Sequence, residues 1–263
     1  MNSKNWILLK ELVKTDFKLR YQGSVIGYLW SILKPIMLFA VMYMVFIKFL
    51  RFGSDVPHFA VALLLGTTVW GFFSEATSMG MVSIVTRGDL MRKISFSKPI
   101  IVLSAVTNAF INLCINLVVV LIFAAFNGVS FSFGFLYIPF LLLELLILVI
   151  GIALLLATLF VKYRDLAPVW EVILQAGMYA TPIIYSVSFV SVNHPLAAKL
   201  MFMNPMAQII QDMRYFLIDP ANVTVWQLLD WKYAFIPYVV PIIILSIGFT
   251  LFNKQSKKFA EII

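Results

Sequence analysis

The side chains of this chain that could do chemistry are few, and three of them are carboxylates inside long apolar stretches: Glu75, Glu144 and Glu171. A carboxylate at such a place can relay a proton or a cation. Alternatively, each one finds a lysine, a backbone group or a polar interface as its partner. Both interpretations stay open, and structural pairing is the favoured one for Glu75 and Glu171.

Catalytic motifs are absent from the sequence. The only histidines are His58 and His194, and Cys114 is the only cysteine, so no disulfide can form within the chain. The sequence contains no HExxH, CxxC, GxSxG or glycine-rich phosphate loop. We therefore expect no enzymatic activity, no metal site and no cofactor bound by this chain.

A second polar pattern lies at 108–116, where Asn108, Asn112 and Asn116 recur every four residues and so share one face of a helix. These amides either form hydrogen bonds between helices or line a pathway for a hydrophilic substrate. Three tyrosines within apolar stretches, Tyr43, Tyr179 and Tyr185, either pack in the core or stack on sugar rings. All six residues are candidates for a substrate pathway.

The composition indicates the class of fold that must position these residues. Of the 263 residues, 62% are hydrophobic and 12% are charged, whereas soluble proteins have about 45–50% and about 25%. Such a chain is an integral membrane protein, which excludes a cytosolic enzyme, a disordered protein and a secreted disulfide scaffold. At ~20 residues per crossing, it has room for about six spans.

Charges and turns delimit these spans. The 45 uncharged residues between Lys98 and Glu144 are too many for one crossing, and Asn127-Gly128 supplies a turn between two helices. The sequence predicts an all-α integral membrane fold with six transmembrane helices. Their ranges are 29–50, 58–80, 99–126, 135–161, 168–187 and 233–253. Inner segments then hold fifteen Lys and Arg residues and outer loops five, which places both termini in the cytoplasm.

Two further segments are predicted to be helical without crossing the membrane. Residues 1–24 form an amphipathic helix on the inner leaflet, with Lys10, Lys14 and Lys18 toward the headgroups and with Asp16 and Arg20 interrupting the apolar half. Residues 195–217 are too apolar for a solvated loop. Asn204-Pro205 divides them into two short helices, which we expect to be re-entrant at the outer face.

The loop 87–98 combines charged and apolar residues at near-helical spacing. It contains Arg87, Asp89, Leu90, Met91, Arg92 and Lys93. This is either an ordinary basic inner loop or a short amphipathic helix whose apolar ridge docks into a cytosolic partner.

Taken together, these segments resemble those of ABC transporter permeases of the type-2 exporter superfamily. The resemblance is closest to the branch that exports O-antigen, capsule or teichoic acid. The segments that carry it are YQGSVIGYLWSILKP (21–35), GDLMRKISFSKPI (88–100), LFVKYRDL (159–166), TPIIYS (181–186) and NPM (204–206), and they follow in the expected order.

The resemblance implies a homodimeric channel in the plasma membrane, with two separate ATPase subunits that hold ATP and Mg. Segment 87–98 would be the main coupling helix, and Arg164 and Asp165 a second contact. Lys10, Lys14, Lys18 and Arg20 would rim the entrance for a polyprenyl- or otherwise lipid-linked glycan. Asn204 and Pro205 would belong to outer gate helices. No nucleic acid is expected as a partner.

Three alternatives compete with polysaccharide export. A type-2 exporter of drugs or other lipids would share the same fold. An ion-coupled carrier would use Glu144. A membrane glycosyl- or acyltransferase would require a catalytic cluster, which the sequence does not offer.

Overall fold

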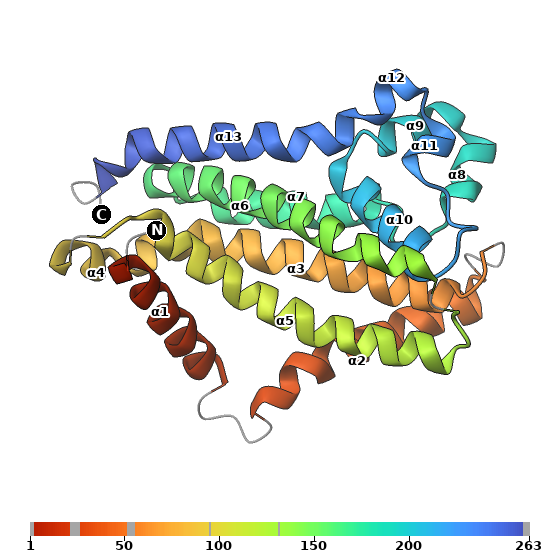
Figure 1. The fold of residues 1–263 in the computed structure, drawn as a ribbon, viewed down its shortest axis with the longest axis horizontal. Coiled ribbons are helices and arrows are strands. Elements are labelled where there is room, and N and C mark those ends of the chain that lie inside the picture. Colours follow the sequence, from red (N-terminus) through yellow and green to blue (C-terminus); the bar gives the residue numbers. More distant parts are fainter. Residues whose placement is uncertain (1–2, 22–26, 52–55, 95, 131, 260–263) are drawn as a thin grey trace.

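The computed structural model describes residues 3–21, 27–51, 56–94, 96–130 and 132–259, without the side chains of residues 3, 4, 20, 21 and 28. Every regular element in these ranges is helical. The long helices lie lengthwise beside one another, and the short helices gather at one end (Figure 1). These short helices are α8 (Val187–Asn193), α9 (Pro195–Met201), α10 (Pro205–Leu217), α11 (Val225–Leu228) and α12 (Trp231–Ala234). Both ends of the described chain lie at the opposite end, together with α4 (Gly88–Lys93).

Five helical stretches are long and apolar enough to cross a membrane. They are α2 (Trp30–Met42) continued by η2 (Tyr43–Phe49), α3 (Phe59–Thr86), α5 (Pro99–Phe126), η3 (Phe133–Tyr137) continued by α6 (Ile138–Lys162), and α12 (Trp231–Ala234) continued by α13 (Ile236–Ser256). Their bounds agree within a few residues with five of the six predicted spans, except that α3 continues to Thr86. The turn predicted at Asn127-Gly128 is present, with Gly128 at a φ of +74°, a backbone conformation that glycine adopts readily.

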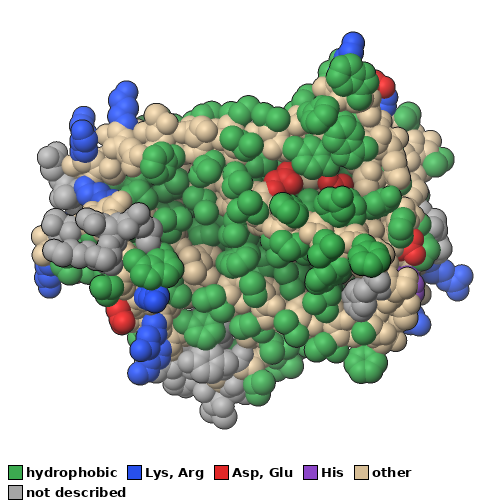
Figure 2. Space-filling view, in the orientation of Figure 1, with side chains coloured by type: hydrophobic (Ala, Val, Ile, Leu, Met, Phe, Trp, Pro, Cys, Tyr) green, Lys and Arg blue, Asp and Glu red, His purple; other side chains and the backbone are tan. Residues whose placement is uncertain are grey.

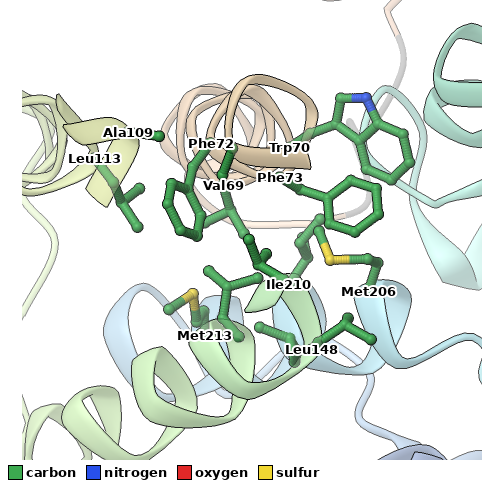
Figure 3. Packing of buried hydrophobic residues seen from close by; sticks show 14 of the residues in the cluster. Val69, Trp70, Phe72, Phe73, Ala109, Leu113, Leu148, Met206, Ile210 and Met213 are labelled. Carbon is green, nitrogen blue, oxygen red and sulfur yellow. The ribbon is translucent and has the colours of Figure 1, made fainter. Parts of the chain in front are cut away.

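Helix α3 is the centre of the bundle. It packs along α5, α6 and α7 (Leu166–Ala180), and α10 (Pro205–Leu217) covers its first half. Figure 3 shows Val69, Phe72 and Phe73 of α3 pointing toward side chains of α5, α6 and α10. Leu63, Leu65 and Val69 have no exposed surface. This helix is therefore shielded by protein, whereas most of α2 and α13 is not.

The predicted span 168–187 is wrong as a single helix. The structure has α7 (Leu166–Ala180), whose 15 residues reach about 22 Å at 1.5 Å per residue. Thr181 is extended, with φ −96° and ψ 137°, because the residue before a proline is sterically disfavoured in a helix. Hydropathy had merged the helix with the apolar but non-helical turn that follows it at residues 181–185.

Helix α7 nevertheless packs along the part of α3 between Trp70 and Met81. Its first turns pack with Met81 near the C-terminal end of α3, and Trp170 donates a hydrogen bond to Thr77 Oγ1 at 3.1 Å. Farther along, a Cβ on Gly177 would lie 2.9 Å from the Trp70 ring. The chain therefore travels from one end of the bundle to the other between α6 and α8.

The short helices after α7 are α8 (Val187–Asn193), α9 (Pro195–Met201), α10 and α11 (Val225–Leu228). The predicted division of 195–217 at Asn204-Pro205 coincides with the break between α9 and α10. Asn204 is extended and its side chain accepts a hydrogen bond from the Met206 N–H at 3.0 Å, while Pro205 occupies the first helical position, where its missing N–H costs nothing.

Glycines let α6 and α13 approach each other closely. A Cβ added to Gly151 of α6 would lie 2.6 Å from the backbone nitrogen of Leu245, and one added to Gly248 of α13 would meet the Gly151 carbonyl. Small residues serve this purpose in membrane helix pairs, where close backbone approach replaces the hydrophobic driving force.

The substitution Gly151→Ala is expected to destabilise the protein by about 1–3 kcal/mol, because the added methyl overpacks a backbone contact. The matched control is Gly71→Ala, since a Cβ at Gly71 of α3 meets nothing within 4 Å. There, alanine is expected to leave stability unchanged or raise it by up to about 1 kcal/mol. Thermal unfolding in detergent measures both; equal melting temperatures for the two variants would contradict the close packing.

Candidate functional site

A cleft of about 1460 Å³ runs along four helices, α2, α3, α5 and α7. Its walls combine aromatic and aliphatic side chains with hydroxyl, amide and charged groups. The polar and charged members are Ser31, Lys34, Thr67, Thr68, Ser74, Glu75, Ser78, Asn112, Asn116, Glu171 and Gln175, and Trp30 and Trp70 are among the aromatic ones. A wall of this mixed character suits a ligand that is both hydroxylated and apolar.

The asparagine stripe of α5 forms hydrogen bonds between helices, and part of it lines the cleft. Asn108 is buried and donates a hydrogen bond to Asp16 Oδ2 at 3.3 Å. Asn112 donates to Glu75 Oε1 at 3.0 Å, and Asn116 donates to the Asn112 carbonyl at 2.8 Å. Asn112 and Asn116 also line the cleft, whereas Asn108 does not.

Two of the three carboxylates whose roles were open, Glu75 and Glu171, line this cleft. Glu75 is half-buried and held by Asn112, so its pairing across helices is observed. Glu171 lies on the exposed side of α7.

The three candidate tyrosines are not among the described residues that line the cleft. Tyr43 lies in η2 beside Phe39, with a ring-centroid distance of 5.9 Å. The Tyr185 hydroxyl donates to the Tyr179 carbonyl at 2.8 Å, across the break after α7. Position within an apolar stretch therefore did not indicate which face a tyrosine occupies.

At the end of the bundle that holds both termini, α1 (Ser3–Tyr21) is joined to α3 and α5 by polar contacts. Arg87 forms an ion pair with Asp16 and donates a hydrogen bond to Ser104 Oγ at 3.2 Å. Asp16 interrupts the apolar half of α1 in the sequence, and this break was the signal that α1 contacts protein there. Lys10, Lys14 and Lys18 are exposed; the side chain of Arg20 lies outside the described part of the structure.

The predicted coupling helix 87–98 is shorter in the structure. Helix α4 covers Gly88–Lys93, and Ile94 is extended with φ −135° and ψ 134°. Asp89, Arg92 and Lys93 are exposed, whereas Leu90 and Met91 are half-buried and Met91 packs against the core. The free surface of this segment is therefore charged, and its apolar ridge partly faces the protein.

The second predicted contact lies at the same end of the bundle. Arg164 and Asp165 are exposed in the turn between α6 and α7, and the Arg164 guanidinium lies over the Phe160 ring at 5.3 Å. Phe160 packs with Met81 and Val85 at the C-terminal end of α3, which leads directly into α4. Both predicted contact segments are thus on one face of the molecule.

The sequence did not predict the role of Arg214. In the sequence, Arg214 is one of the five Lys and Arg residues assigned to the outer loops. The side chain is 1% exposed. Its Nε donates to the Ala62 carbonyl at 3.1 Å, Nη1 to Pro182 at 2.6 Å and Nη2 to Ile183 at 2.8 Å. One guanidinium thereby ties the start of α3, the turn after α7 and helix α10 together. Its spacing in the sequence gave no signal of this.

Comparison with known proteins identifies the family of this chain. Residues 7–218 match the family described as ABC-2 type transporter. The chain belongs to the ABC-2 type transporter family. The family resemblance predicted from the five sequence segments is therefore confirmed.

Individual relatives can be aligned with nearly the whole length of this chain. It is similar to an O-antigen export system permease protein RfbA of Klebsiella pneumoniae, with 26% identity over 257 residues, which are 97% of this chain and 95% of the relative. A protein of the same name from Myxococcus xanthus is 25% identical over 254 residues, covering 97% and 94%.

The substitution Arg214→Lys is expected to destabilise the ABC-2 chain by about 2–4 kcal/mol, because one ammonium cannot reach three carbonyls that a planar guanidinium bonds in different directions. Arg164→Lys, at an exposed position, is the control and is expected to leave stability unchanged. Thermal unfolding in detergent is the measurement, and a wild-type melting temperature for Arg214→Lys would contradict the assigned role.

Proposed function

We propose that this chain is the membrane permease of an ATP-driven exporter that moves lipid-linked polysaccharide from the inner to the outer side of the plasma membrane. The observation that carries the proposal is the cleft along α2, α3, α5 and α7, in a chain of the ABC-2 family whose relatives are O-antigen export permeases. Hydroxyl and amide groups on its walls can bond sugar hydroxyls, and the tryptophans can stack on sugar rings.

A second copy of the chain would complete the channel. The surfaces of α2 and α7 beside the cleft expose Leu38, Val41, Val172 and Ile173, and an apolar surface of this kind favours helix packing or lipid. A homodimer related by a twofold axis would bring two clefts together around one passage.

The sixth crossing that the family resemblance implies would be made by α7 together with residues 181–186. The short helix supplies about 22 Å, and the turns and bends that follow it at residues 181–185 would carry the chain onward to α8. Irregular backbone at this depth is acceptable because Arg214 bonds its carbonyls. Helices α9 and α10, joined at Asn204-Pro205, would be the outer gate.

The end of the bundle with α4 and the 163–165 turn would face the cytoplasm, in line with the excess of Lys and Arg there. Two ATPase subunits, which hold ATP and Mg, would dock on the exposed Asp89, Arg92 and Lys93 and on Arg164 and Asp165. The exposed Lys10, Lys14 and Lys18 of α1 would attract the anionic headgroup of the lipid carrier.

Charge reversal on α4, with Arg92→Glu and Lys93→Glu together, is expected to reduce co-purification of the ATPase subunits at least about tenfold, because like charges then face each other across the interface. The control is Lys199→Glu on α9, an exposed lysine at the other end of the molecule. Undiminished assembly of the α4 variant would remove this docking surface.

Blocking the cleft tests its use as the pathway. Gly71 lines the cleft and has open space where a side chain would project, so Gly71→Trp is expected to lower surface polysaccharide to a small fraction of wild type while the protein still accumulates and assembles. Ile243→Trp places the same side chain at an exposed position of α13 and is expected to export normally. Wild-type export by the Gly71 variant would contradict the pathway.

A further inference from the structure

A second cavity of about 460 Å³ lies on the other side of the molecule, among α6, α10, α11 and α13. Its lining residues are Tyr137, Phe140, Leu141, Glu144, Asp212, Phe216, Trp226, Phe235 and Tyr238. Of the described residues, none lines both this acidic aromatic cavity and the cleft, and none that lines the smaller cavity is basic. Two carboxyl groups thus share a cavity walled largely by aromatic rings.

A hydrogen-bond network fixes one oxygen of each carboxyl group. Gln208 Nε2 donates to Asp212 Oδ2 at 2.9 Å and to Glu144 Oε2 at 3.4 Å. The Tyr238 hydroxyl donates to the same Asp212 oxygen at 2.5 Å and accepts from Trp226 Nε1 at 3.1 Å. The two carboxyl groups are therefore held side by side through Gln208.

Three acceptor atoms of this cluster have no hydrogen-bond partner in the described part of the chain: Glu144 Oε1, Asp212 Oδ1 and Gln208 Oε1. Asp212 is 2% exposed and Gln208 0%. A buried acceptor without a donor is costly, and charge on two neighbouring carboxylates adds to that cost. The cluster lacks hydrogen-bond donors and positive charge, and both can come from a ligand.

The mouth of the cavity is apolar. Phe140, Trp226 and Phe235 line it and are exposed, and so are Val239 and Ile242 farther along α13. Figure 2 shows acidic side chains surrounded by hydrophobic ones on this face of the molecule. A ligand that enters from this side has an aliphatic surface along which to lie.

We propose that the acidic aromatic cavity binds the primary ammonium group of an amphiphile, whose hydrocarbon chain lies along α6 and α13. An ammonium group has three N–H donors and no acceptor, and two of the unpaired acceptors, Glu144 Oε1 and Asp212 Oδ1, belong to side chains that line the cavity. Its positive charge balances the carboxylates, and the surrounding rings add cation–π attraction. A ligand that presents only a phosphate or another anion is disfavoured by repulsion from the two carboxylates. This proposal does not depend on the exported substrate.

The test uses the purified full-length chain in maltoside micelles, with dodecylamine as the probe and dodecanol as the matched neutral amphiphile. Dodecylamine is expected to bind saturably, and dodecanol is expected not to bind. Native mass spectrometry measures the binding, and a rise in melting temperature reports it independently. Glu144→Gln with Asp212→Asn is expected to weaken binding at least about tenfold, since charge-assisted hydrogen bonds are lost. Asp230→Asn, an exposed carboxyl outside the cavity, is the control and is expected to bind as wild type.

Two further binding measurements identify the source of the amine. Binding of short-chain phosphatidylethanolamine, lost in the double variant, assigns the site to a lipid headgroup; binding of dodecylamine alone assigns it to another amphiphilic amine. Equal binding by wild type and double variant, or binding of ethanolamine as tight as that of dodecylamine, overturns the proposal. If the double variant does not fold, Glu144→Gln alone, assayed on the folded fraction, decides in the same way.

Discussion

Polar groups in an apolar surrounding must find their partners within the protein, and this constraint organises the molecule. Where α7 ends, the carbonyls of Pro182 and Ile183 lose their helical donors, and the Arg214 guanidinium takes both. The same side chain bonds Ala62 at the start of α3. Without it, the carbonyls of Pro182 and Ile183 would lose these donors where the chain passes from the long helices to the cluster of short ones.

The same constraint operates at the opposite end of the bundle. Asp16 of α1 is paired with Arg87, at the junction of α3 and α4, and accepts a hydrogen bond from Asn108 of α5. A movement of α4 would therefore be transmitted to α1 and α5 through one half-buried polar cluster. Such a connection is what a docking helix needs if an event in a soluble partner is to reach the cleft.

The long helices could be predicted from the sequence because the length of an apolar run reflects the thickness of a bilayer. The division at Asn204-Pro205 was also predictable, since it depends on local cap and proline chemistry. The length of α7 was not, because hydropathy does not distinguish an apolar helix from an apolar turn that continues it. The roles of Asp16 and Arg214 depend on partners 71 and up to 152 residues away in the chain, and local spacing carries no information about such contacts.

The central claim is that this chain provides a passage but no driving force. The most direct measurement is transport of a lipid-linked polysaccharide into proteoliposomes that contain the chain alone, with a proton gradient, or the chain with its ATPase subunits and ATP-Mg. The account predicts uphill movement only in the second case. Uphill movement by the chain alone, abolished when the proton gradient collapses, would contradict it and would assign the transport to an ion-coupled carrier.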